Sequence, residues 1–143
     1  MAVRVRLRVR CKLSGEVAET VALVNTGFET EPPQLMLPVA LAKRLSLYPP
    51  PPTATIVELG TAGGPVRLVL VREALEVWAV TGDREVGPRV ADALVSLIEE
   101  EVLINDKLTE ELGIVLLAAG SGKWRFADDP PDRVRYSERP QYW

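Results

Sequence analysis

The chain has 143 residues, of which 47% are hydrophobic, and its formal net charge is −3. This length and apolar content match one folded domain and exclude extensive disorder. The slight acidity gives no overall attraction to nucleic acid, and the absence of histidine excludes Ser-His and Cys-His catalysis and His-ligated metals. We therefore expect neither a metal nor another cofactor.

The single cysteine, Cys11, rules out an internal disulfide framework. No apolar stretch is long enough to cross a membrane as a helix, and the N-terminal residues alternate where a signal peptide would be continuously apolar. We therefore expect a cytoplasmic protein that does not enter a membrane. Most of the 17 basic residues are arginine and there are 12 prolines, a composition typical of heat-adapted proteins from a thermophile.

Residues 3–13 alternate strictly between apolar and basic side chains, which predicts a half-buried strand. A Ser-Gly pair then predicts a tight turn, and residues 16–24 return as the second strand of a hairpin. The five cations on one face suggest nucleic-acid binding, but no aromatic residue is interleaved for base stacking. We therefore favour a solvated face neutralised by Glu16 and Glu19 or by a partner chain. The apolar face comprises Val3, Val5, Leu7, Val9, Cys11 and Leu13.

The second strand runs into a polar turn with the sequence Asn25-Thr26-Gly27, and the chain becomes apolar again at Phe28. Short aliphatic runs bounded by glycine are typical of buried strands. After a polar loop that contains two prolines, a helix is expected to begin near Pro38, because proline fits the first helical turn.

Two β-rich runs, 53–59 and 66–71, flank a glycine-rich segment, which predicts a β-hairpin with a mobile tip. Further strands are expected over 75–80, 90–95 and 102–104. The hairpin tip consists of Gly60, Thr61, Ala62, Gly63 and Gly64.

Three consecutive glutamates at 99–101 could bind a hard cation, but neighbouring side chains on an extended chain point to opposite faces. We interpret this run as a solvated acidic loop. Residues 106–112 predict a short helix, which Asn105 or Asp106 would cap and Gly113 would end.

A buried strand is expected over 114–118, followed by a glycine-rich turn that superficially resembles a phosphate-binding loop. Leu117 replaces the upstream glycine of that motif, and Trp124 stands where a hydroxyl would hold magnesium, so a nucleotide site is excluded. The tail, 127–143, is too polar to form its own core. It is either disordered or docked on a partner subunit, and its terminal aromatic residues favour docking.

Three motifs in the same order resemble those of the retropepsin-like aspartic proteases of the cellular and archaeal type. The Asn-Thr-Gly turn resembles the Asp-Thr-Gly turn of that family. Residues 37–47 resemble its "LPxxLAxxLGL" helix, with Ser46 in place of glycine, and residues 103–116 resemble its second motif, with Asn105 in place of glycine. The resemblance implies a mainly β fold for residues 1–126: a closed retropepsin-like β-barrel, the single-lobe acid-protease fold, with one or two short helices.

In that family, two aspartates share one proton, one acting as the base on water and the other as the acid. Each chain supplies one such turn, so the resemblance implies a homodimer. Asn25 occupies the catalytic Asp position, and an amide cannot act as a general base. Thr26 would hydrogen-bond across the dimer axis and Gly27 would permit the tight turn. Phe28 and the 60–64 tip, as a flap, would contact a bound segment; a plain β-hairpin is the alternative for the tip.

Asn25 has three competing explanations: it is encoded, it is an engineered inactivation, or the resemblance is structural only. Inactivation would not require the second departure at Asn105, so we favour an encoded residue. The sequence therefore predicts a non-catalytic homodimer, a pseudoprotease, that binds an extended peptide or protein segment in the dimer cleft. The alternative is an aspartic endopeptidase whose catalytic Asp is replaced by Asn25.

Overall fold

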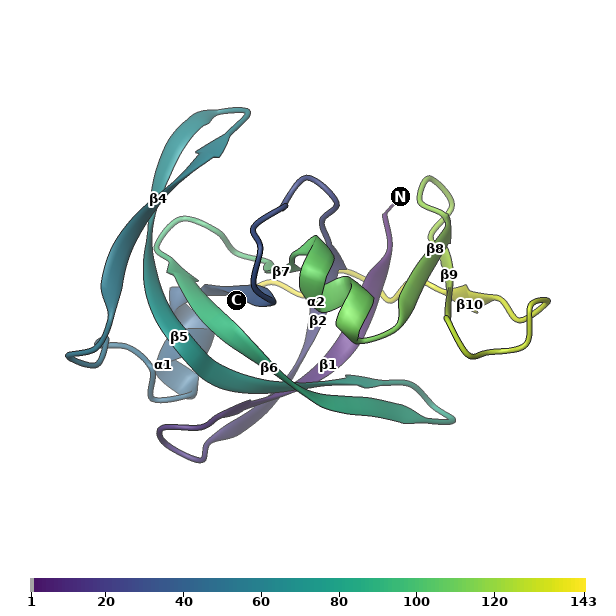
Figure 1. Cartoon of the computed structure of the whole chain (residues 1–143), viewed down its shortest axis with the longest axis horizontal. Helices are drawn as coiled ribbons and strands as arrows, with labels where there is room; N and C mark the ends of the chain where they lie inside the picture. Colours follow the sequence, from purple (N-terminus) through teal and green to yellow (C-terminus); the bar gives the residue numbers. More distant parts are fainter. Residues whose placement is uncertain (1) are drawn as a thin grey trace.

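The computed structural model describes residues 2–143. Strands make up 51% of it and helices 8%, and six strands close into a barrel. The predicted mainly β, closed, single-lobe barrel with one or two short helices is therefore confirmed, and there are two such helices. Figure 1 shows this barrel with one long hairpin projecting from it and a small second sheet on the opposite side.

The barrel strands follow the order β1-β2-β7-β3-β6-β5, and β5 pairs again with β1 to close the ring. β7 lies between β2 and β3, parallel to the first and antiparallel to the second. The loop that joins β2 to β3 is thereby held against the end of β7. The strands are β1 (Arg4–Cys11), β2 (Val17–Val24), β3 (Gln34–Pro38), β5 (Gly64–Val80), β6 (Glu85–Ser96) and β7 (Val102–Ile104).

The first hairpin forms as predicted, with β1 and β2 antiparallel and the alternating apolar residues of β1 buried in the barrel. One residue of the predicted face is misplaced, because Leu13 is 62% exposed. The strand ends at Cys11, whose carbonyl accepts the Gly15 N–H at 2.8 Å, so Leu13 lies in the turn.

The basic face of β1 is neutralised, but not by the glutamates nearest in sequence. Arg8 forms an ion pair with Glu85 at 2.6 Å, and Arg4 forms one with Glu101. These partners lie far along the chain and reach β1 because the barrel closes beside it. Glu101 is therefore a paired residue and not part of a solvated acidic loop.

Two features of the barrel differ from the sequence-based prediction. The fully buried strand β3 was not predicted, since its five residues carry no alternation. The two strands expected over 66–71 and 75–80 form one continuous strand, β5, with a bulge between Val71 and Leu75. Within the bulge, Glu73 has a φ of 50°, and its N–H donates to the buried Asp92 carboxylate at 2.8 Å.

Both expected helices are present and each has six residues. Helix α1 (Val39–Arg44) begins directly after Pro38, and helix α2 (Asp106–Glu111) is capped by Asn105, whose side chain accepts the Leu108 N–H at 2.9 Å. Across residues 2–143, no helix has the length and apolarity required to cross a membrane.

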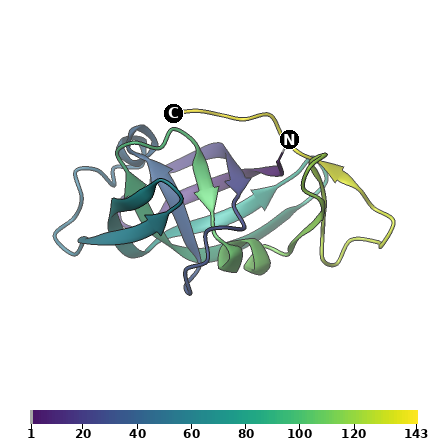
Figure 2. The ribbon, with the colours of Figure 1, turned by 90° about the horizontal axis from the view of Figure 1, so that it is seen from above.

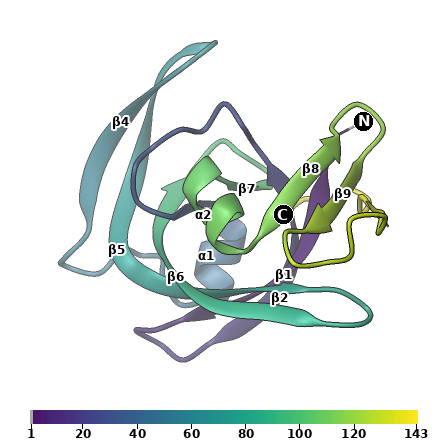
Figure 3. The same ribbon diagram turned by 45° about the vertical axis from the view of Figure 1, so that its right-hand side comes forward.

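The predicted glycine-tipped hairpin is formed by β4 (Thr55–Thr61) and the first half of β5. β4 is the last strand of its sheet, so one of its edges has no strand partner. Figures 1 and 3 show the hairpin rising away from the barrel, with its tip on the same side as the β2–β3 loop.

The second sheet contains β8 (Ile114–Ala118), β9 (Lys123–Phe126) and β10 (Arg135–Tyr136), in the order β10-β9-β8. The tail, for which disorder or docking on a partner subunit was expected, instead packs on the barrel of its own chain. The Glu138 N–H donates to the Arg4 carbonyl, and the Trp143 indole donates to the buried Thr20 hydroxyl at 2.9 Å. Figure 2 shows the tail passing across one side of the barrel.

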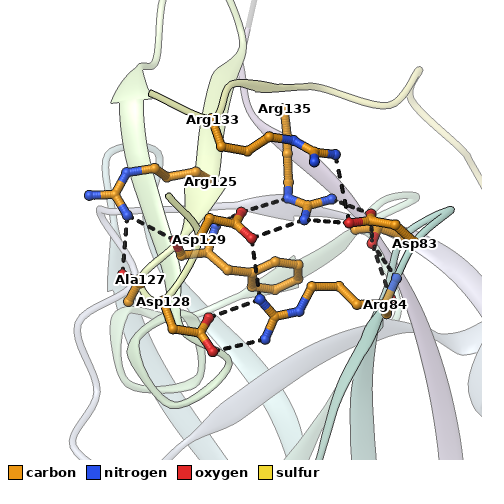
Figure 4. A network of polar contacts seen from close by, with 10 residues as sticks. Asp83, Arg84, Arg125, Ala127, Asp128, Asp129, Arg133 and Arg135 are labelled. Atoms are coloured by element: carbon orange, nitrogen blue, oxygen red, sulfur yellow. Dashed lines mark hydrogen bonds and ion pairs between the residues drawn. The ribbon is translucent and has the colours of Figure 1, made fainter. Parts of the chain in front are cut away.

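An ion-pair network ties the tail to the turn after β5 (Figure 4). The buried Arg135 donates to Asp129 at 2.8 Å and forms two bonds to Asp83. Its guanidinium holds the pKa of both carboxyl groups well below the usual range, and they raise its own pKa in turn. Arg84 also contacts Asp129, and both guanidinium groups lie close to the Phe126 ring.

Candidate functional site

A cavity of about 590 Å³ lies between the β2–β3 turn and the tip of the β4–β5 hairpin. Its two sides come from parts of the chain that are more than thirty residues apart in sequence, and the barrel brings them together. The lining comprises Asn25, Gly27, Phe28, Met36, Leu59, Gly60, Thr61, Ala62, Gly63, Val66, Leu68, Ser96, Ile98, Glu99 and Leu103.

Most of the candidate residues from the sequence converge on this cavity. Asn25, Gly27 and Phe28 line one side, and the hairpin tip over residues 60–63 lines another. Gly64 and Thr26 are outside the lining. The structure therefore unites the polar turn and the glycine-rich tip, which the sequence linked only through the family resemblance.

Backbone hydrogen bonds hold Asn25 at the end of β2. Its N–H donates to the Ile104 carbonyl on β7 at 3.2 Å, and its carbonyl accepts the Phe28 N–H at 3.1 Å. The Asn25 Oδ1 atom accepts the Gly27 N–H at 3.1 Å, which closes a side-chain turn of the type that Asn and Asp favour. An aspartate carboxylate could accept the same bond, so this turn suits either residue.

Gly27 was expected to permit a tight turn through its conformational freedom. Gly27 does not have a left-handed φ, so its backbone conformation does not require glycine. A Cβ at this position would lie 3.4 Å from Asn25 Oδ1 and meet no closer atom. Glycine here leaves space beside the Asn25 amide, on the side of the cavity.

Asn105, the second position at which the sequence departs from the motif it resembles, is completely buried and has a definite structural role. Its Oδ1 accepts the N–H groups of Leu108 and Gln34 at 2.9 and 3.0 Å. Its Nδ2 donates to the carbonyl of Pro32 at 2.8 Å and to Thr30. One side chain thus caps α2 and fastens the loop that carries Phe28 into the cavity wall.

Thr26 is exposed and lines a separate groove of about 440 Å³ next to Asn25. The other side of this groove is formed by Leu116 and Ala119, at the β8–β9 end of the second sheet. β8 is the end strand of that sheet and leaves one edge without a strand partner. The groove has no charged side chain, and its lining also includes Ala2, Val3, Leu23, Val24 and Gly120.

Sequence reasoning missed the apolar wall of the cavity and the loop between β6 and β7. Leu59, Val66 and Leu68 come from the hairpin strands, which were predicted as strands without any indication that one of their faces would line a cavity. Ile98 and Glu99 come from the β6–β7 loop. The one sequence feature that could have indicated this part of the cavity is an isoleucine next to an acidic run, and Ile98 is 75% exposed.

The cavity of a single chain holds an amide, small hydroxyl groups and one carboxylate, Glu99. It contains no pair of carboxyl groups that could share a proton in the manner of an aspartic protease. Across residues 2–143, no three acidic or cysteine side chains converge closely enough to hold a metal ion. The arrangement can bind an apolar group and offer hydrogen bonds from Asn25 and the hairpin backbone.

No family model matches this chain, and no curated protein matches it.

Proposed function

We propose that the chain is a retropepsin-like pseudoprotease: a non-catalytic homodimer that binds an extended peptide or protein segment. One observation carries the proposal, namely the cavity shared by the Asn25 turn and the tip of the β4–β5 hairpin. A glycine-rich hairpin above an apolar cavity suits an extended chain. The exposed backbone N–H and C=O groups of the hairpin can form β-sheet hydrogen bonds with that chain, which then pairs as an added strand.

The absence of catalysis is argued from Asn25. An amide has no titratable proton near neutral pH and cannot take a proton from water. Loss of acid–base catalysis by a single group already lowers a rate about 10²–10⁴-fold. Two amides facing each other in a dimer would keep the geometry and the hydrogen bonds of the site without the chemistry.

The homodimer is proposed because one chain contributes only one such turn. Asn25, Thr26 and Leu116 line one uncharged groove, and Leu116 belongs to β8, the end strand of the second sheet. We assign this face to the second copy. Pairing there would place two Asn25 turns near one two-fold axis. A cytoplasmic location and adaptation to heat remain predictions from composition.

The alternative is an aspartic endopeptidase whose catalytic Asp is replaced by Asn25. It is kept because the side-chain turn to Gly27 would accept an aspartate without rearrangement. Peptide-library cleavage from about pH 3 to pH 7 distinguishes the two, using the chain as given, Asn25→Asp and Asn25→Ala. Intact mass spectrometry of each sample verifies that Asn25 has not hydrolysed to Asp.

We expect no cleavage by the chain as given or by Asn25→Ala, together with saturable binding of library peptides to the chain as given. Cleavage by Asn25→Asp alone would identify an intact protease scaffold that lacks its acid. Cleavage by the chain as given would refute the pseudoprotease proposal. Light scattering at micromolar concentration tests the homodimer, and a monomer would contradict it.

A further inference from the structure

The walls of the cavity carry a single ionisable side chain. Fourteen of the lining residues are apolar, glycine or neutral polar, and the remaining one is Glu99. The apolar wall includes Phe28, Leu68 and Leu103, which belong to one buried cluster beneath the hairpin. A ligand in this cavity therefore meets hydrophobic surface and one negative charge.

The loop that carries Glu99 is anchored at both ends. At its start, the buried Ser96 hydroxyl accepts the N–H groups of Ile98 and Glu99 at 3.2 and 3.0 Å. At its end, the Glu100 carbonyl accepts the Trp143 N–H at 2.8 Å, and Glu101 is paired with Arg4. The backbone at Glu99 is thus fixed while its side chain remains exposed.

The charge of Glu99 is not neutralised within the part of the chain that the structure describes. The ion pairs of residues 2–143 do not include it, whereas its neighbour Glu101 is held by Arg4. No arginine or lysine lines the cavity. The cavity wall of this chain therefore offers Glu99 no partner, and a ligand that carries a cation can pair with it.

We propose that the cavity selects an extended segment in which a large apolar side chain lies close to a lysine or arginine. The apolar side chain fills the space between Phe28 and the hairpin, and the cation pairs with Glu99. The pairing gains strength as the ligand displaces water from the cavity, because the effective dielectric constant falls. This inference rests on the proposed function and names the class of ligand that it binds.

Fluorescence anisotropy tests the pairing with several sets of three labelled peptides. The peptides of one set share an apolar anchor and differ only in a neighbouring Lys, Gln or Glu, and the sets differ in the anchor. Each peptide is titrated with the chain as given and with Glu99→Gln, Glu99→Lys and Glu100→Gln. Glu100 is the matched control, because it is the adjacent exposed glutamate and does not line the cavity. Circular dichroism verifies that each variant is folded.

We expect Glu99→Gln to weaken binding of the Lys peptide about fivefold and to leave the Gln peptide unchanged. Glu99→Lys should reverse the preference in favour of the Glu peptide, and added salt should reduce both effects. Glu100→Gln should bind all three peptides as the chain as given does.

Equal affinity of the chain as given for the Lys and Gln peptides would overturn the cation preference and leave the proposed binding function standing. The same loss in Glu100→Gln as in Glu99→Gln would also overturn it, since a diffuse acidic surface would then account for the effect. No binding of any peptide, including those with different apolar anchors, would refute the proposed function itself.

Discussion

Replacement of Asn105 by alanine should destabilise the protein strongly, although the side chain lies outside the cavity. The amide makes bonds to two N–H groups, those of Leu108 and Gln34, and to the carbonyl of Pro32. Asn105 is fully buried, so water cannot replace these partners without opening the structure.

The expected loss in the free energy of unfolding is the sum of two contributions. Loss of the N-cap contributes about 1 kcal/mol. The Gln34 N–H, left buried without its acceptor, contributes about 2 kcal/mol more. The sum of about 3 kcal/mol corresponds to a fall of about 10 °C in the Tm of a domain of this size.

Urea denaturation followed by circular dichroism measures the free energy of unfolding of the chain as given, Asn105→Ala, Asn105→Asp and Asn105→Gly. Asn105→Asp keeps an oxygen that accepts the N–H groups of Leu108 and Gln34 but cannot donate to the Pro32 carbonyl. Its loss of stability therefore measures the donated bond to the loop separately from the helix cap. Asn105→Gly introduces the glycine of the motif that the sequence resembles, and it should lose less of the cap, because glycine is tolerated at the N-cap. A loss below about 1 kcal/mol in Asn105→Ala would refute the assigned role.

The remaining predictions concern the tail. Because Arg135 lowers the pKa of Asp83 and Asp129, its ion pairs stabilise the fold fully above the unfolded-state pKa of about 3.9, and that stabilisation is lost as the pH falls toward the lower folded-state values. In urea titrations below about pH 4, Arg135→Met should therefore lose less stability on acidification than the chain as given, and parallel curves would contradict this coupling. Trp143→Phe keeps an aromatic ring but removes the bond to Thr20, and it should lower the free energy of unfolding by about 1–2 kcal/mol. An unchanged denaturation midpoint would show that the tail contributes no stability through this contact.

Local pattern was sufficient for the elements whose residues alternate or carry strong capping signals. The period-two pattern from Val3 to Cys11 gave the first strand, because every second side chain of a strand meets the core. Pro38 marked the start of the first helix for a local steric reason, and Asn105 or Asp106 marked the start of the second as a hydrogen-bonding cap. The same logic failed at Leu13, where the turn began two residues earlier than the pattern suggested.

The sequence predicted only part of the candidate site. The Asn25 turn and the 60–64 tip were singled out as site residues through the resemblance to the retropepsin-like proteases, and the structure brings most of these residues to one cavity. Glu99 was assigned to a solvated loop, because nothing local indicates that Ser96 anchors the loop beside the cavity. The uniformly buried β3 was missed because a strand covered on both faces carries no alternation.

By itself, the sequence determined the mainly β class, the first hairpin, the two short helices and the presence of an amide at position 25. Each of these depends on residues that are close together along the chain, or on the identity of one side chain. Only the tertiary structure decided that Arg4 pairs with Glu101, that the tail lies on its own barrel through Trp143, and that one carboxylate, Glu99, lines the cavity. These contacts join residues that are distant in sequence, and they exist because the closure of the barrel sets which strands become neighbours.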